Sequence, residues 1–248
     1  NGNMALSIAK GLQKDFQIEV VGRDMNKLEK FESNLDVKVS KSLMTDFNID
    51  GKTIILCVKP NNIQEVGKLL IGKAKIVYSV LAGTTIETIE RNISSQSQIR
   101  TMPNVAASVN NSLTTITGDE KFKDEALKLF SAIGTTIWLG SEKEIDIATA
   151  LAGSGPAYLA LIAEALTDAA VKQGLKRADA QKITQGLFDG FAPLLQTMHP
   201  SILKDSVMSP GGTTAAGIGA MEKGNVRATC IDAIEKAYER ACELGKGK

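Results

Sequence analysis

Hydrophobic and polar residues alternate in two different ways along the chain, and the change falls near residue 144. Before that point, short runs of apolar and β-branched residues alternate with longer segments whose apolar residues recur at helical spacing. The runs at 54–58 and 76–80 are almost continuously apolar, as in strands that are covered on both faces. The pattern predicts a mostly parallel, doubly wound α/β sheet domain over residues 1–144.

The strands expected in this first domain span residues 17–21, 37–39, 53–58, 75–80, 98–102, 113–117 and 135–139. The helices expected between them span residues 4–13, 26–34, 63–70, 86–91 and 121–133. Strands and helices therefore follow one another in the order that the crossover connections of a parallel sheet require.

Residues 145–248 are Ala-rich and keep helical periodicity, with Gly and Pro only at the breaks between segments. Long helices are expected over 157–172, 178–198 and 226–244, and many of their residues are small. Small residues allow helices to pack closely, either within one chain or between two. We expect an all-helical second domain through which the chain forms a homodimer or a higher homo-oligomer.

Composition excludes several classes of partner. The 29 Lys and Arg against 28 Asp and Glu leave a formal charge of +1, and aromatic residues make up only 4%. Nucleic acid and membrane are therefore not expected as partners. No apolar run approaches the roughly 18 residues of a membrane span, and no signal peptide is visible, so we expect a cytoplasmic protein. The three cysteines have no metal-ligand spacing, so no metal is expected.

The chain opens on Asn1-Gly2-Asn3-Met4-Ala5 and continues into an expected helix and strand. One more Gly before Asn1 would complete a G-x-G-x-x-A dinucleotide motif, and we expect that Gly and a first strand to precede this start. Gly2 would let the backbone approach a pyrophosphate at the helix N-terminus. The alternative is a glycine near the chain start with no role in binding.

Arg23 follows the strand expected at 17–21, where the second strand of a dinucleotide domain selects its cofactor. A guanidinium there can stack on adenine and pair with a 2′-phosphate, which favours NADPH. Asp24 keeps NADH possible, because a carboxylate can bind the 2′-hydroxyl instead. The alternative is that Asp24 caps a helix beside solvated basic residues such as Lys27.

A loop in the second domain carries the sequence Ser-Pro-Gly-Gly-Thr-Thr over residues 209–214. Pro210 breaks the preceding helix, Gly211 and Gly212 permit an open turn, and a new helix is expected to follow. Free backbone N–H groups and threonine hydroxyls at such a start suit a small carboxylate. A capped helix with no ligand is the alternative.

Four motifs resemble the pyrroline-5-carboxylate reductase family in the order that the family has them. They are Val58-Lys59-Pro60, Arg100-Thr101-Met102-Pro103-Asn104, Gly153-Ser154-Gly155-Pro156-Ala157 and the segment LKDSVMSPGGTTAAGIGAME over 203–222. The resemblance extends from Asn1 to the last helix and implies a Rossmann-type domain followed by a helical dimerisation domain. It also implies reduction of 1-pyrroline-5-carboxylate to L-proline with NAD(P)H.

The resemblance further implies which residues form the site. The cofactor-binding residues would be Gly2, Asn3, Met4, Arg23, Val58, Lys59, Pro60 and Ala82. The substrate-binding residues would be Ser209, Gly212, Thr213 and Thr214, with the Thr214 hydroxyl directed at the ring nitrogen.

The single histidine, His199, stands before Pro200 in an expected turn, so a structural role is favoured over catalysis. A cyclic imine that is basic enough to arrive protonated needs no strong acid, so Thr214 is expected to orient the substrate. Lys59 is an alternative proton donor.

Two other classes of function stay open. One is another oxidoreductase of the same layout, either a reductase of another small cyclic imine or a hydroxyacid dehydrogenase. Hydroxyacid dehydrogenases of this layout use a lysine on the long helix as the acid. No lysine occurs between Gly153 and Lys172, which argues against the hydroxyacid enzyme. The other is a regulatory protein that binds a dinucleotide without turnover.

Overall fold

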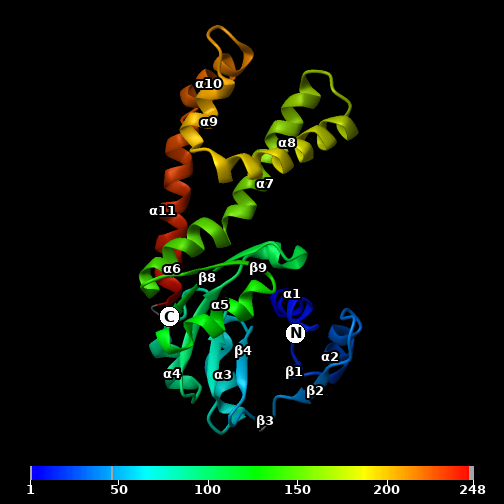
Figure 1. Cartoon of the computed structure of the whole chain (residues 1–248), viewed down its shortest axis with the longest axis vertical. Coiled ribbons are helices and arrows are strands. Elements are labelled where there is room, and N and C mark those ends of the chain that lie inside the picture. Colours follow the sequence, from blue (N-terminus) through cyan, green and yellow to red (C-terminus); the bar gives the residue numbers. More distant parts are fainter. Residues whose placement is uncertain (1, 46, 246–248) are drawn as a thin grey trace. The chain divides into compact units, whose positions relative to one another are not determined.

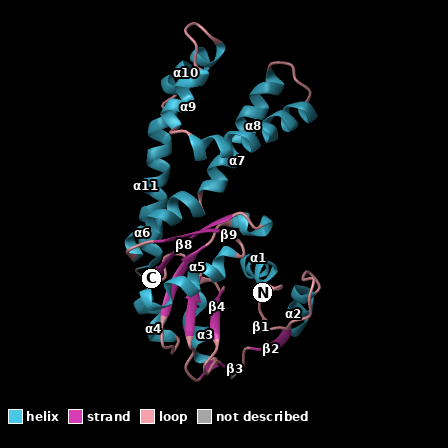
Figure 2. Ribbon diagram, viewed as in Figure 1, coloured by secondary structure: helices cyan, strands magenta, loops and turns pink. Residues whose placement is uncertain are grey.

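The computed structural model describes residues 2–45 and 47–245 of the chain, which form two compact units. The first unit comprises Asn1–Pro156 and Glu235–Lys248, and the second comprises Ala157–Ile234. Strands occur in the first unit, whereas the described part of the second contains only helices and connecting loops, as Figure 2 shows.

The main sheet has the strand order β4-β6-β7-β8-β9. These strands are β4 (Thr53–Leu56), β6 (Ile76–Ser79), β7 (Gln98–Met102), β8 (Ser112–Gly118) and β9 (Gly134–Trp138). All neighbours are parallel except β7 and β8. The predicted parallel sheet is thus confirmed, with one antiparallel neighbour that the pattern did not indicate.

Two short parallel pairs stand apart from this sheet (Figure 1). β1 (Glu19–Gly22) pairs with β2 (Ser40–Leu43), and β3 (Phe47–Asn48) pairs with β5 (Leu70–Ile71). The second strand was predicted over 37–39 and lies at β2 instead, so that prediction was wrong. The residues of β2, Ser-Lys-Ser-Leu, are half-buried or exposed, and such a polar sequence carries little of the apolar signal that marks a strand.

Helices cover both faces of the main sheet. The helices of the first unit are α1 (Asn3–Leu12), α2 (Met25–Glu32), α3 (Ile63–Lys68), α4 (Ile86–Asn92), α5 (Lys123–Ser131) and α6 (Glu142–Ala148), with short 3-10 turns η1 (Pro60–Asn62), η2 (Val105–Val109) and η3 (Glu120–Phe122). Of these, α2 packs on the β1–β2 pair. On one face, Tyr78 and Ile116 pack with α1 and α5 around Phe130. On the other, Val77 and Leu81 pack with α3 and α4. The doubly wound arrangement follows from these two apolar layers.

The second unit is built from long helices. It contains most of α7 (Gly155–Lys172), then α8 (Arg177–Thr197), α9 (Pro200–Val207), α10 (Thr213–Lys223) and the first part of α11 (Val226–Gly245). A π-helical turn, η4 (Thr149–Gly153), joins α6 to α7. Large apolar side chains of this unit are exposed, among them Leu161, Ile183 and Leu187. Patches of this kind on a soluble protein usually mark a surface that a partner covers.

The compact units divide the chain differently from the boundary expected at residue 144. The first unit continues to Pro156 because α6 is tied to β7 by ion pairs. It also includes the end of α11, where the Ala241 carbonyl lies 2.7 Å from the position that a Cβ on Gly83 would occupy. The final turns of the last helix therefore pack on the sheet domain.

Residues Glu142–Lys172 form one helix that is long and apolar enough, by length and composition, to cross a membrane. The expectation that no segment approaches a membrane span therefore needs correction. Small apolar residues in this helix are interrupted by polar ones, so no single run is long, although the mean hydropathy of an 18-residue window reaches 1.4. The core helix of a soluble protein passes the same test of length and composition.

Candidate functional site

The N-terminus of α1 is open to an anion. Gly2 is the N-cap with extended backbone (φ −94°, ψ 176°), and no side chain caps the helix. No acidic residue lies in the first turn, so nothing there opposes a negative ligand at the positive end of the helix dipole. A Cβ on Gly2 would meet no atom within 4 Å, which leaves room for a bulky group beside the first-turn N–H groups. This helix start fits a pyrophosphate.

Arg23 and Asp24 lie at the end of β1. The Asp24 side chain is the N-cap of α2 and accepts a hydrogen bond from the Lys27 backbone N–H at 3.3 Å. The capping alternative for Asp24 is therefore what the structure shows. Arg23 donates from Nη1 to Glu65 Oε1 at 2.9 Å, and both side chains are more than half exposed. An exposed pair of this kind is weak, so the Arg23 guanidinium stays available to a phosphate.

The loops after β4 and β6 leave the sheet at the same edge. β4 and β6 are parallel, with Leu56 opposite Ser79, so Val58, Lys59 and Pro60 leave the sheet beside Ala82. Ligands of doubly wound sheets bind outside these carboxyl ends. Pro60 opens η1, and the exposed Lys59 stands before it in extended conformation. The structure thus brings together the residues predicted for the ribose and nicotinamide end of the cofactor.

Gly83 shows how closely the loop after β6 is packed. Its φ is +69°, a left-handed conformation that favours glycine. A Cβ at this position would also lie 3.0 Å from the Leu244 side chain on α11. The Ala82–Gly83 segment therefore packs tightly against the end of α11.

A buried ion cluster supports the same edge of the sheet. Arg100 on β7 is 2% exposed, and it donates to Glu142 Oε1 at 3.0 Å and to Asp146 Oδ1 at 2.6 Å. Glu142 Oε1 also accepts from the Ile86 backbone N–H at 2.8 Å. Arg100 thereby links β7, α6 and the start of α4, which follows the Ala82 loop.

Asn104 fixes the end of β7. Its side-chain carbonyl accepts from the Ala106 N–H at 3.1 Å, and its amide donates to the Ala152 carbonyl in η4 at 3.1 Å. Single π-turns of this kind often occur at functional sites. In the sequence, Arg100 and Asn104 belong to a motif that resembles the family, and no role is predicted for either of them. No sequence signal pairs either one with its partners in α6 and η4, since those lie more than forty residues away.

The Ser-Pro-Gly-Gly-Thr-Thr segment forms one tight turn in the second unit. The Gly212 N–H donates to the Ser209 carbonyl at 3.0 Å, and Gly211 has φ +73°. A Cβ on Gly212 would lie 2.7 Å from Ser209 Oγ and 3.1 Å from the Ser209 carbonyl oxygen, so a side chain there would displace the Ser209 hydroxyl and crowd the turn. Gly212 is the N-cap of α10, which no side chain caps, and Thr213 and Thr214 form its first turn. The predicted substrate residues therefore share one uncapped helix start that suits a carboxylate.

Other predicted features lie elsewhere. His199 is the N-cap of α9, where its Nδ1 accepts from the Ser201 backbone N–H at 3.3 Å, so it has a structural role. Burial raises the pKa of the Cys57 thiol to about 12, which keeps it neutral and unreactive. Within residues 2–45 and 47–245, no group of three His, Cys, Asp or Glu side chains could hold a metal ion.

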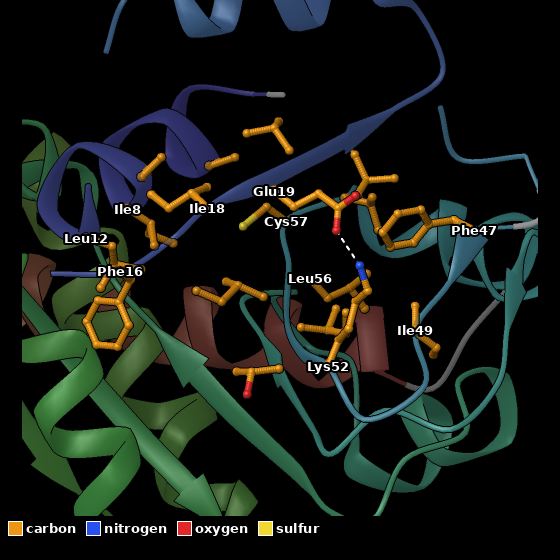
Figure 3. A pocket seen from close by; sticks show the side chains of 18 of the residues that line it. Ile8, Leu12, Phe16, Ile18, Glu19, Phe47, Ile49, Lys52, Leu56 and Cys57 are labelled. Carbon is orange, nitrogen blue, oxygen red and sulfur yellow. Dashed lines mark hydrogen bonds and ion pairs between the residues drawn. The ribbon is translucent and has the colours of Figure 1, made fainter. Parts of the chain in front are cut away.

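A cavity of about 460 Å³ lies between α1, β1 and β4 (Figure 3). Its lining is mainly apolar, with Ile8, Ile18 and Leu56 among the side chains. Of the residues predicted for cofactor or substrate, only Val58 lines it. The cavity is therefore distinct from the helix starts and loops described above.

Comparison with known proteins agrees with this arrangement. A family model described as pyrroline-5-carboxylate reductase dimerisation matches residues 142–244, and one described as NADP oxidoreductase, coenzyme F420-dependent, matches residues 1–83. A pyrroline-5-carboxylate reductase of Synechocystis is 37% identical over 223 residues, which cover 87% of this chain and 83% of the relative.

Solved structures give the same result. The structure of a pyrroline-5-carboxylate reductase from Coxiella burnetii is 33% identical and has a TM-score of 0.82, covering 98% of this chain and 95% of that one. The enzyme of Streptococcus pyogenes is 30% identical with a TM-score of 0.86, covering 98% and 96%. The predicted fold class, a Rossmann-type domain followed by a helical dimerisation domain, is confirmed.

Proposed function

Since the chain belongs to the pyrroline-5-carboxylate reductase family, we propose that it reduces L-1-pyrroline-5-carboxylate to L-proline, the last step of proline biosynthesis. The observation that carries this proposal is 37% identity to a curated reductase over 87% of the chain. The tight turn at Ser209–Thr214 gives it a physical basis, because it presents an uncapped helix start to a carboxylate.

The proposed hydride donor is NADPH, with NADH as the second choice. The first-turn N–H groups of Asn3 and Met4 beside Gly2 would hold the pyrophosphate, and Arg23 would exchange its exposed partner Glu65 for the 2′-phosphate. Val58, Lys59, Pro60 and Ala82 would lie along the ribose and nicotinamide, at the carboxyl ends of β4 and β6. When bound, the cofactor supplies the hydride.

The substrate would be held by its carboxylate in the turn that contains Ser209, Gly212 and Thr213. Thr214 would direct its hydroxyl to the ring nitrogen and fix the face of the ring that receives the hydride. The C=N carbon gains the hydride, and the π electrons of that bond pass to nitrogen, which already carries its proton in the iminium form. Thr214 therefore orients the ring, and Lys59 contributes positive charge beside the cofactor.

The assembly proposed for this enzyme is a homodimer, or a higher homo-oligomer built from dimers, in the cytoplasm. Residues 145–248 would form its substrate-binding and oligomerisation domain and residues 1–144 its dinucleotide-binding domain. Exposed leucines and isoleucines of the second unit provide the apolar surface that such an interface needs.

The direct test is the oxidation of NADPH and of NADH, followed by absorbance, with pyrroline-5-carboxylate as substrate. We expect rapid oxidation that depends on the substrate and is faster with NADPH. Oxidation only with a different cyclic imine or with a hydroxyacid would move the assignment to another reductase of this fold. Cofactor binding without turnover on any of these substrates would favour a regulatory protein.

A further inference from the structure

One backbone carbonyl in the helix that runs from α6 through η4 into α7 receives a donor from outside that helix. An α-helix would direct the N–H of residue 156 at the carbonyl of Ala152, four positions earlier, but Pro156 has no N–H. The side-chain amide of Asn104 donates to this carbonyl instead, at 3.1 Å. Beside it the helix widens into the π-turn, in which the Ser154 N–H donates to the Thr149 carbonyl at 3.1 Å. Pro156 therefore leaves an acceptor free, and Asn104 binds it.

Asn104 is held by its backbone as well as by its side chain. Its backbone N–H donates to Ser112 Oγ on β8 at 3.1 Å, and its side-chain carbonyl accepts from the Ala106 N–H in η2, also at 3.1 Å. The residue is half-buried, and hydrogen bonds are stronger in surroundings of lower dielectric than water. One side chain thus joins the end of β7 to η2 and to η4.

Asn104 lies at the edge of the sheet that is proposed for the nicotinamide. β6 and β7 are parallel with Ser79 opposite Arg100, so Ala82 and Pro103, three positions further along each chain segment, leave the sheet side by side. Ligands of doubly wound sheets bind outside these carboxyl ends. Asn104 therefore follows the strand end that is next to the Ala82 loop.

The segment that starts at Asn104 also packs against the helix proposed to hold the pyrophosphate. Ala107 of η2 is 1% exposed and belongs to the same apolar cluster as Ile8 of α1, against which Met4 packs. Met4 lies in the first turn of α1, whose N-cap is Gly2. The position of η2 is therefore coupled by packing to the start of α1 and by the Asn104 side chain to η4.

We propose that Asn104 is a positioning residue for hydride transfer. Its amide holds η4 to the end of β7, and this bond fixes the backbone beside the Ala82 loop, where the nicotinamide is proposed to lie. Asn104 acts through that backbone and not by contact with the reacting atoms. The inference rests on the proposed reductase function, because it assigns Asn104 to the hydride step of that reaction. An error of about 1 Å in placement can lower the rate of such a step about 10²-fold.

The variant Asn104→Ser removes the bond to η4 selectively. The serine hydroxyl can still accept from the Ala106 N–H as the N-cap of η2, but it is too short to reach the Ala152 carbonyl. Asn92→Ser is the matched control, because Asn92 is also half-buried and its amide donates to the Thr88 carbonyl at 2.8 Å. Asn92 ends α4, which leads to the start of β7, so it lies at the opposite edge of the sheet.

A second substitution separates positioning from stability. Pro156→Ala supplies an N–H four positions after Ala152, so in Asn104→Ser/Pro156→Ala the carbonyl regains a donor within its own helix. We expect this double variant, compared with Pro156→Ala alone, to recover the Tm that Asn104→Ser loses. Its hydride step should stay slow, because the new bond does not hold η4 to β7.

Four quantities are measured for each variant: kcat with NADPH and pyrroline-5-carboxylate, the deuterium isotope effect on kcat, the fluorescence of bound NADPH, and Tm. In Asn104→Ser we expect kcat to fall about 10²-fold while the Kd for NADPH from fluorescence stays nearly constant. The isotope effect should rise, because hydride transfer becomes rate-limiting. Asn92→Ser should leave kcat and the isotope effect unchanged.

The fluorescence lifetime of bound NADPH tests the placement of the nicotinamide without substrate. We expect a shorter lifetime in Asn104→Ser than in the wild-type chain, because the ring is held less rigidly. An unchanged lifetime and kcat in this variant would overturn the proposal. Recovery of kcat together with Tm in the double variant would also overturn it, since the bond would then only satisfy a carbonyl. A wild-type chain that binds NADPH without reducing pyrroline-5-carboxylate would contradict the proposed function alone, and the lifetime would still test Asn104.

Discussion

The two compact units differ in how much of their apolar surface they cover themselves. In the first, the sheet residues Ile76, Val77 and Tyr78 are 0% exposed between two layers of helices. In the second, Leu161 on α7 is 66% exposed and Leu187 on α8 is 56% exposed. The central strands of the first unit are thus covered on both faces, whereas large apolar side chains of α7 and α8 in the second unit are exposed. The comparison teaches that the helical unit exposes apolar surface where the dimerisation family model matches, as a homo-oligomer requires.

Charging the exposed face of the second unit should give the largest effect. Leu161→Asp removes the burial of one leucine from each protomer, about 3–6 kcal/mol for a symmetric dimer, so dimers should dissociate about 10²–10⁴-fold more readily. Light scattering after gel filtration measures the change. Ile71→Asp is the control, since Ile71 is 52% exposed on the first unit. Dissociation by both variants, or by neither, would contradict the comparison.

Breaking the ion cluster of the first unit should have an effect nearly as large, but on the free energy of unfolding and not on dimer dissociation. Arg100→Met leaves Glu142 and Asp146 without their buried partner, which typically costs about 3–5 kcal/mol in the free energy of unfolding. Arg91→Met is the matched control, because Arg91 pairs with Glu87 on an exposed helix surface and contributes at most about 0.5 kcal/mol. Denaturant unfolding measures the free energy of unfolding of both variants. An equal loss in the two would show that Arg100 does not stabilise the fold through its ion pairs with α6.

Closing the substrate turn should affect activity and leave folding intact. In Gly212→Ala, the new Cβ would lie 2.7 Å from Ser209 Oγ and 3.1 Å from the Ser209 carbonyl oxygen, so the predicted substrate-binding hydroxyl of Ser209 must move and the turn is crowded. A misplacement of this order can reduce kcat/KM about 10²-fold. In the control Gly217→Ala, the Cβ would meet no atom within 4 Å, and alanine favours the helix by about 1 kcal/mol. Steady-state kinetics with pyrroline-5-carboxylate should show a lower kcat/KM for Gly212→Ala and an unchanged kcat/KM for Gly217→Ala.

The smallest effect is expected at the cofactor end. Arg23→Gln removes a charged hydrogen bond to the 2′-phosphate, so KM for NADPH should rise about tenfold while KM for NADH stays nearly constant. Glu65→Gln frees Arg23 from its exposed partner and should leave or improve the preference for NADPH. An equal rise of KM for both cofactors in Arg23→Gln would mean that Arg23 contacts a group that the two share.

Sequence patterns predicted the elements that carry strong periodicity. The strand expected at 98–102 is β7, and the long helices of the second half are α7, α8 and α11. Helix α6 was missed, although the Ser-x-x-Glu pattern of Ser141 and Glu144 signals its start. The Glu144 N–H donates to Ser141 Oγ at 3.3 Å, and the Glu144 carboxylate accepts from the N–H of Gly140, the residue before the N-cap, at 2.7 Å.

Only those parts of the site that are formed by residues close together in the chain could be predicted from the sequence. The turn at Ser209–Thr214 depends on adjacent Pro, Gly and Thr residues, so its uncapped helix start could be foreseen. The bonds of Arg100 to Glu142 and of Asn104 to Ala152 join residues more than forty positions apart, and no local pattern specifies such pairs. Asp24 shows that a local pattern can fit two roles. Its carboxylate fitted a role in cofactor selection, but in the structure it caps α2.

The most direct test of the central claim follows the hydride itself. NADPH that carries deuterium at the transferable position is mixed with pyrroline-5-carboxylate and the enzyme, and the product is analysed by mass spectrometry. We expect proline that carries one deuterium on the ring carbon of the former C=N bond. Consumption of NADPH without deuterium in proline, or no proline from an enzyme that is folded and binds NADPH, would contradict it.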